Sequence, residues 1–287
     1  MKKVLKSVCT GLLAGAVILS GASGLVISPD VMSAATVKPP TVDQMIAKLT
    51  ATSKTLKSFH WKMNETVTLQ SGGMTSNDTG SMDLDINRLP KFVASGSAYA
   101  KSLDLTFGLF ANDKEFYQLV DGGFINSQAE EATADPESAE SGEELFDPEA
   151  QYWLPMEQED WDTLYSKSQF DPGSVLDSVK NYKKFMKVTN AGTQTVLQFT
   201  ITEPNAAKAL IQLYDRDNLE AGATVQPKTV TWKLYANSKT WQTEKLTVDL
   251  NYTLVKDAEK NTYTTKTVAV YSNHNKVANI VKPAELE

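Results

Sequence analysis

The stretch Lys228–Val255, "KTVTWKLYANSKTWQTEKLTVDLNYTLV", alternates apolar and polar residues in two runs that flank a turn. Successive side chains of a strand point to opposite faces, so each run predicts a β-strand with one apolar and one polar face. Such a face either packs on a filled core or lines a hollow that holds an apolar ligand. The alternation allows both. The apolar positions are Val230, Trp232, Leu234, Leu246, Val248, Leu250, Tyr252 and Leu254.

Similar short runs recur along the chain and are separated by turn residues. This spacing is typical of an antiparallel meander or open barrel rather than of βαβ units. On the predicted upstream strands, Trp61, Met63, Leu84 and Leu105 occupy apolar faces. Residues 71–80, "SGGMTSNDTG", predict a loop. Further strands are predicted at 61–69, 82–86, 91–100, 103–110, 114–120, 195–201 and 262–273.

Three amphipathic segments predict helices. The first follows Pro39-Pro40, with Thr41 and Gln44 in a capping-box pattern. The other two are residues 170–186, with Asp171 as N-cap, and residues 203–217. A helix, a run of strands, two short helices around one strand and more strands predict an α+β fold with a large antiparallel sheet.

The N-terminus predicts secretion. Residues 1–35 have the layout of a secretory signal peptide, whereas an uncleaved anchor would need a longer, less Gly- and Ser-rich stretch. A bacterial lipoprotein carries its cysteine after the apolar stretch, and here the single cysteine precedes it, so no lipid anchor is expected. One domain is expected over 36–287. The pattern consists of Lys2, Lys3, Lys6, Cys9, the uncharged Gly11–Ile27, Ser33 and Ala35.

The charge is acidic. The 287-residue chain has a net charge of −7, and removing residues 1–35 takes away three lysines and one aspartate and leaves −9. This balance argues against general electrostatic binding to nucleic acid or anionic membranes. Nine acidic residues fall within 127–151, which predicts a flexible acidic loop. A calcium site there is disfavoured because the carboxylates lack the spacing of a known loop.

Three stretches carry a resemblance: "KSFHWKM" where the first helix meets a strand, "WKLYANSKTWQTEKL" in the hairpin, and "YSNHNKVANIVKPAE" at the end. Over Val42 to Glu285 the layout resembles the LolA/LppX-like superfamily, here as a Gram-positive secreted member. The resemblance implies a curved, half-open antiparallel sheet with helices over its concave face and a cavity that can hold acyl chains.

The expected function is therefore an envelope-associated protein that holds a lipid or another hydrophobic ligand in the sheet cavity. Glu65 shares a face with apolar residues; it either lies near an edge or pairs with a lysine, or it orients a ligand headgroup at the cavity mouth. An envelope protein is a possible partner, and a monomer is expected. The candidate cavity residues are Trp61, Met63, Glu65, Leu84, Leu105, Trp232, Leu234, Leu246, Val248 and Leu250.

The alternative is a non-enzymatic interaction or sensor module with a filled core. Catalysis is not expected, because His60 and His274 are the only histidines and no nucleophile or metal motif accompanies them. The chain from Thr36 has no cysteine, so thiolate metal sites and disulfides are excluded there. No metal or cofactor is predicted.

We predict that the secreted protein begins at Thr36, because Ser33 and Ala35 supply the small residues that signal peptidase requires. N-terminal sequencing of material from the culture medium measures this directly. Recovery of the chain with Met1 in the membrane fraction would contradict the prediction.

Overall fold

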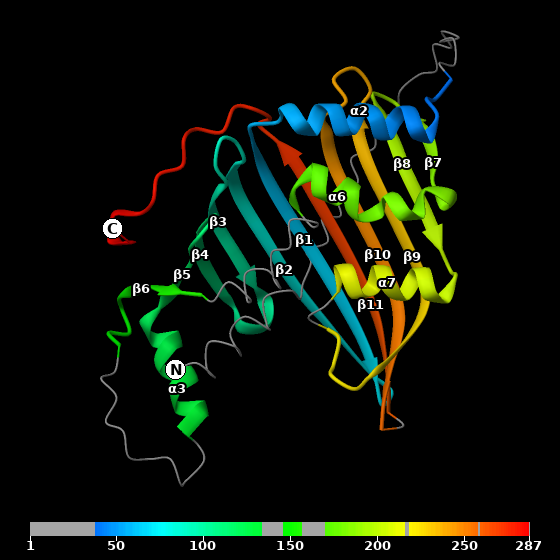
Figure 1. Ribbon diagram of the computed structural model, residues 1–287. Helices are drawn as coiled ribbons and strands as arrows, with labels where there is room; N and C mark the ends of the chain where they lie inside the picture. The colour runs from blue at the N-terminus through cyan, green and yellow to red at the C-terminus, as the bar shows by residue number, and fades with distance from the viewer. Residues whose placement is uncertain (1–37, 134–145, 157–169, 216–217, 258, 287) are drawn as a thin grey trace, which may run out of the picture.

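The computed structural model describes residues 38–133, 146–156, 170–215, 218–257 and 259–286, with backbone alone at 128–133. Its centre is one unclosed sheet of eleven strands, in which every neighbouring pair is antiparallel (Figure 1). The predicted α+β class with a large curved antiparallel sheet is confirmed. The strands are β1 (Ser58–Ser71), β2 (Met74–Asn87), β3 (Val93–Ala100), β4 (Leu105–Asn112), β5 (Phe116–Asp121), β6 (Gln151–Pro155), β7 (Lys187–Ala191), β8 (Gln194–Ile201), β9 (Thr224–Asn237), β10 (Thr243–Lys256) and β11 (Glu259–Ser272).

The sheet consists of two meanders joined side by side. The order is β6-β5-β4-β3-β2-β1-β11-β10-β9-β8-β7, so the first strand pairs with the last. Five of the strands, β1, β2, β9, β10 and β11, are 14 residues long. The centre of the sheet is therefore made from segments at opposite ends of the chain.

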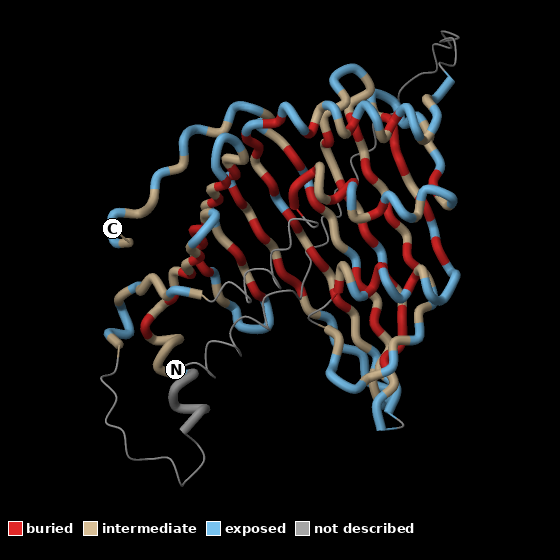
Figure 2. The backbone as a smooth tube through the Cα atoms, in the orientation of Figure 1, coloured by how far each residue is buried: buried red, intermediate tan, exposed pale blue. Residues whose placement is uncertain are grey.

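The hairpin β9–β10 has the two faces that its sequence predicts. All of its alternate apolar residues from Val230 to Leu254 are buried (Figure 2). The Trp232 ring stacks on Phe199 of β8 at a centroid distance of 5.3 Å, and its indole N–H donates to the Tyr214 hydroxyl at 3.1 Å. Around Trp232 the apolar face packs on a filled core.

Four α-helices accompany the sheet in the described residues, and two of them, α2 and α6, have side-chain caps. They are α2 (Val42–Thr55), α3 (Gly122–Thr133), α6 (Pro172–Val179) and α7 (Pro204–Tyr214), with short 3₁₀ turns at Lys101–Leu103, Lys180–Phe185 and Ala284–Leu286. Thr41 and Gln44 form the predicted capping box, and Asp171 caps α6 as predicted. Figure 1 places α6 and α7 over the part of the sheet that contains β9 and β10.

A buried carboxylate fixes the end of α7 to the sheet. Asp215 accepts hydrogen bonds from the Tyr252 hydroxyl at 2.9 Å, the Thr265 hydroxyl at 2.7 Å and the Asn218 amide at 2.5 Å. Burial raises the pKa of Asp215, and these three donors oppose the rise. A buried acceptor needs such partners, so α7 has a defined position on β10 and β11.

The curvature has identifiable local causes. A Cβ at Gly96 of β3 would lie 2.0 Å from the Asp83 carbonyl oxygen on β2, so a glycine is needed where the two strands approach. The pairing of β9 with β10 shifts register between Thr243 and Lys245 and again between Asn251 and Tyr252. Such bulges increase local twist and bend the strand.

Several sequence predictions need correction. Residues 74–80, predicted as loop, form the first half of β2, because Gly72 and Gly73 alone make the turn. The sequence analysis predicts no strand at the positions of β6 and β7, each of which is only five residues long. Residues 127–133 of the predicted acidic loop continue α3.

Two predictions fall wholly or partly outside the described residues: the signal peptide over 1–35, and residues 134–145 of the acidic segment. Both remain predictions. Phe146, toward the C-terminal end of the acidic segment, is bound to α3: its backbone carbonyl and N–H form hydrogen bonds with the Asn126 side chain at 2.7 and 3.0 Å. Among the helices that the structure describes, none has the length and apolar character needed to cross a bilayer.

We predict that Leu250→Ala lowers the free energy of unfolding by about 2–5 kcal/mol, because Leu250 is 1% exposed and its removal leaves a cavity. Urea denaturation measures the change. The control is Val270→Ala on β11, where 42% exposure limits the expected change to about 0.5 kcal/mol. Equal losses from the two variants would show that the inner face at Leu250 is not a packed core.

Candidate functional site

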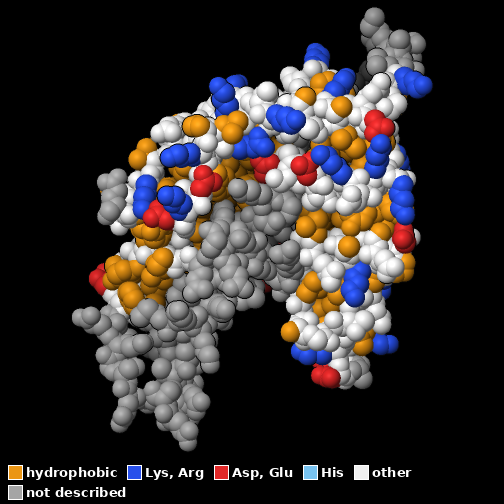
Figure 3. All heavy atoms as spheres, in the orientation of Figure 1, with side chains coloured by type: hydrophobic (Ala, Val, Ile, Leu, Met, Phe, Trp, Pro, Cys, Tyr) orange, Lys and Arg blue, Asp and Glu red, His pale blue; other side chains and the backbone are white. Residues whose placement is uncertain are grey.

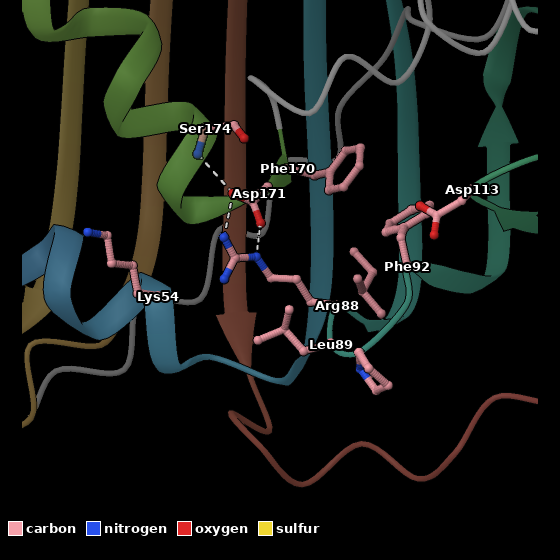
Figure 4. Close-up of a pocket in the computed structure, with 10 residues that line it drawn as sticks. Lys54, Arg88, Leu89, Phe92, Asp113, Phe170, Asp171 and Ser174 are labelled. Carbon is pink, nitrogen blue, oxygen red and sulfur yellow. Dashed lines mark hydrogen bonds and ion pairs between the residues drawn. The ribbon is translucent and has the colours of Figure 1, made fainter.

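A pocket of about 430 Å³ opens at the end of the sheet where α2, α6 and the β2–β3 loop meet. We call it the mouth pocket. Its volume lies within the range of about 300–1,000 Å³ that is usual for small-molecule sites. Figure 4 shows its lining, which combines apolar side chains with one ion pair. The lining residues are Lys54, Ile86, Arg88, Leu89, Pro90, Phe92, Asp113, Phe170, Asp171 and Ser174.

Arg88 organises the polar side of the mouth pocket. Its guanidinium pairs with the Asp171 carboxylate and donates to the backbone carbonyls of Ser53 and Leu56 at the end of α2. Asp171 also accepts from the Ser174 backbone N–H at 2.8 Å as the N-cap of α6. One side chain thus joins the end of β2 to two helices, and its charge is balanced by Asp171.

The opposite wall is aromatic. The Phe92 and Phe170 rings are stacked with centroids 5.9 Å apart, and Ile86 of β2 lies beside them in the lining. Phe170 in turn meets Trp61 of β1 edge to face, at a centroid distance of 6.1 Å. The apolar wall of the mouth pocket therefore continues onto the inner face of the sheet.

Beyond this contact lies a second, much smaller space, here called the inner void. It has a volume of about 20 Å³, which is enough for one water molecule but not for a chain of carbons. Glu65 of β1 lines it and accepts a hydrogen bond from the Thr267 hydroxyl at 2.7 Å. The lining residues are Trp61, Met63, Glu65, Tyr214, Leu246, Val248, Thr267 and Ala269.

Two buried polar groups near this space have no hydrogen-bond partner among the described residues: the Trp61 indole N–H and the Tyr271 hydroxyl. The residues are paired across β1 and β11. Burial raises the pKa of Tyr271, and the Trp61 N–H opposes the rise in part without reaching hydrogen-bond geometry. Burial also raises the pKa of Tyr214 to about 12. An unpaired donor in an apolar site favours a polar group that brings an acceptor.

The ten residues predicted for the cavity divide into two groups. Trp61, Met63, Glu65, Leu246 and Val248 meet around the inner void. The others do not line either space: Leu84, Trp232, Leu234 and Leu250 are buried on the same sheet, and Leu105 is partly buried at the start of β4. Glu65 lies on a central strand rather than at an edge of the sheet.

The mouth pocket itself was missed by sequence reasoning. Its residues come from four separate segments of the chain. Asp171 was identified only as a helix cap, and alternation could not place Arg88, which follows the last residue of β2. A signal was nevertheless present, because an arginine after a strand next to "LPKF" marks an exposed loop with apolar residues.

Neither histidine faces these spaces. His60 lies between Asp83 and Asp85, with nitrogen–oxygen distances of 3.1 and 2.9 Å. The Nε2 atom of His274 is 2.8 Å from the Thr243 carbonyl oxygen. Within the described residues, no group of three or more His, Cys, Asp or Glu side chains is arranged to hold a metal ion.

Comparison with solved structures finds similar proteins at low identity, and three of them are as follows. LprF from Mycobacterium bovis is 12% identical, with 86% of this chain and 99% of LprF covered at a TM-score of 0.41. The LolA superfamily protein NE2245 from Nitrosomonas europaea is 9% identical, with 84% and 96% covered at 0.26. A DUF1329 family protein from Desulfovibrio piger is 8% identical, with 86% and 97% covered at 0.22.

One of these similar proteins, NE2245, belongs to the LolA superfamily, which the sequence of this chain resembles. All three TM-scores are below 0.5, so these similarities carry no functional argument. The functional proposal therefore rests on the residues of this chain. No curated protein matches the sequence. A family model matches residues 41–287, a range that includes every described helix and strand. The chain belongs to the family of unknown function DUF6612.

Proposed function

We propose that this protein is an extracytoplasmic binding protein for a lipid or another hydrophobic ligand, which enters at the mouth pocket and lies against the inner face of the sheet. The observation that carries the proposal is the mouth pocket itself: about 430 Å³ with Ile86, Phe92 and Phe170 as one wall. Apolar walls with a few fixed polar groups are typical of small-molecule sites.

The ligand is proposed to continue from the mouth toward Trp61. Phe170 lines the mouth pocket and contacts Trp61, and the inner void of about 20 Å³ is too small for an acyl chain. A longer ligand therefore requires the Phe170 ring to turn away. The chain end would then lie beside Trp61 and Met63, and a polar group at that depth would meet the unpaired Trp61 N–H.

The second candidate is an interaction module with a filled core. It is favoured by the packing at the β9–β10 end, where Trp232, Leu234 and Leu250 are fully buried. In that case the mouth pocket is a surface recess and binds no apolar ligand. Both candidates are binding functions, and neither uses a catalytic group.

We predict that the neutral fluorophore N-phenyl-1-naphthylamine gains emission with the native protein and is displaced by fatty acids. Ser174→Trp should weaken this binding about tenfold or more, because the indole fills the mouth pocket and removes its space for apolar contact. The Ser174 backbone N–H still donates to Asp171, so the cap of α6 is kept. Fluorescence titration measures the affinity.

The matched control is Asp177→Trp, which adds the same ring on the exposed side of α6 and should leave the affinity unchanged. Thermal melting of both variants checks the fold. Equal binding by Ser174→Trp and the native protein would place the fluorophore outside the mouth pocket. If the native protein does not bind the fluorophore, the interaction module is the candidate function that remains.

A further inference from the structure

The loops around the mouth pocket are basic, although the chain as a whole is acidic. Four exposed lysines lie in or next to its lining segments: Lys54 at the end of α2, Lys57 before β1, Lys91 after Pro90, and Lys114 after Asp113. Of the acids in the described part of these segments, Asp113 is exposed, Asp171 is balanced by Arg88 and Glu115 pairs with Lys282. Figure 3 shows numerous Lys and Arg side chains on the upper part of the molecule, where α2 lies.

An exposed leucine lies among these cations. Leu89 is 47% exposed and lines the mouth pocket. Its position is fixed, because the backbone N–H groups of Arg88 and Leu89 both donate to the Lys57 carbonyl, at 2.8 and 3.2 Å. We call Lys54, Lys57, Leu89, Lys91 and Lys114 the mouth rim. An exposed apolar side chain surrounded by lysines is the pattern of segments that lie at a membrane interface.

We propose that the mouth rim docks on an anionic lipid bilayer, so that the opening of the mouth pocket faces the lipid. The lysines supply attraction to anionic headgroups, and Leu89 enters the boundary between headgroups and acyl chains. The passage of ligand between bilayer and pocket rests on the proposed function, whereas the docking itself does not.

The acidic net charge does not oppose this docking. Charges are screened over about 8 Å at physiological ionic strength, so a surface meets the local charge of the rim rather than the total charge of the chain. Nine of the acidic residues are concentrated within 127–151, and none of the described residues of that segment lines the mouth pocket. The repulsion expected from composition is an average over the whole chain, and the rim differs from that average.

A role for the lysines in holding an anionic ligand inside the pocket fits less well. In Figure 4 Lys54 extends away from the aromatic wall, and Arg88 is engaged by Asp171. Lys57, Lys91 and Lys114 are exposed and do not line the pocket. Their side chains are thus available to a surface in front of the opening.

The experiment is vesicle co-sedimentation of protein that is expressed with its own leader and recovered from the medium. The two vesicle types are pure phosphatidylcholine and phosphatidylcholine with about a third phosphatidylglycerol. We expect binding to the anionic vesicles alone, weakened by added salt. Replacing Lys54, Lys57, Lys91 and Lys114 by Gln should weaken it about a hundredfold or more, since each lysine near an anionic surface contributes about fivefold.

Leu89→Ser tests the apolar part and should weaken binding about tenfold in low and high salt alike. The matched control replaces four exposed lysines of α7, β9 and β11 by Gln, and we expect little change; they are Lys208, Lys228, Lys260 and Lys266. Thermal melting confirms that each variant is folded.

Equal binding to both vesicle types, no vesicle binding, or the same loss in the control would overturn the proposal. So would lysine-dependent binding of a monomeric phosphate-headed detergent without vesicle binding, because the rim would then serve a free anionic ligand. Binding of N-phenyl-1-naphthylamine is measured without vesicles. Failure of the docking therefore leaves the proposed ligand site intact, and failure of the ligand site leaves the docking result intact.

Discussion

The structure depends on one constraint: a sheet of eleven antiparallel strands with a single apolar face must hide that face without closing into a barrel. Curvature and a few short helices achieve this together. The two bulges in the β9–β10 pairing bend the strands, Gly96 lets β3 approach β2, and α7 is fixed to the inner face by the buried Asp215 carboxylate. Where the helices pack directly on the strands, as around Trp232, the core is filled. Where helix ends and strand ends diverge, the mouth pocket remains.

Arg88 has a central part in that divergence. Its guanidinium binds Asp171 and the last carbonyls of α2, and so it sets the spacing between two helices and the end of β2. A charged pair at this place costs desolvation, which an apolar contact would avoid. The ion pair keeps the helices joined while the space beside Phe92 and Phe170 stays open, and this links the stability of the mouth to its shape.

The strands and capped helices could be predicted from sequence because their signals are local. Period-two alternation in β9 and β10 and the Thr41–Gln44 capping box each lie within one segment. The start of β2 could not be predicted from the sequence. Met74 to Asp78 are polar or exposed on both faces, so this part of the strand has no apolar–polar alternation. The site could be predicted only in part. Trp61, Met63 and Glu65 share one face of β1, Leu246 and Val248 share one face of β10, and the two sets meet at the inner void. The contact of Arg88 with Asp171 joins residues 83 positions apart and follows from the fold.

The question raised by the β9–β10 hairpin, a filled core or a hollow, has different answers along one sheet. Leu250, Trp232 and Ile86 are all fully buried, but Ile86 lines the mouth pocket whereas Leu250 and Trp232 line neither space. Both sets of residues are apolar and alternate with polar ones, so their sequence pattern is the same. What differs is the end of the sheet at which each residue lies: Arg88 joins the helices to the strands at the mouth pocket, and Asp215 joins α7 to β10 and β11. Averages over the sequence hide this difference, as the net charge hides the basic mouth rim: the proposed binding depends on the residues at one end of the molecule.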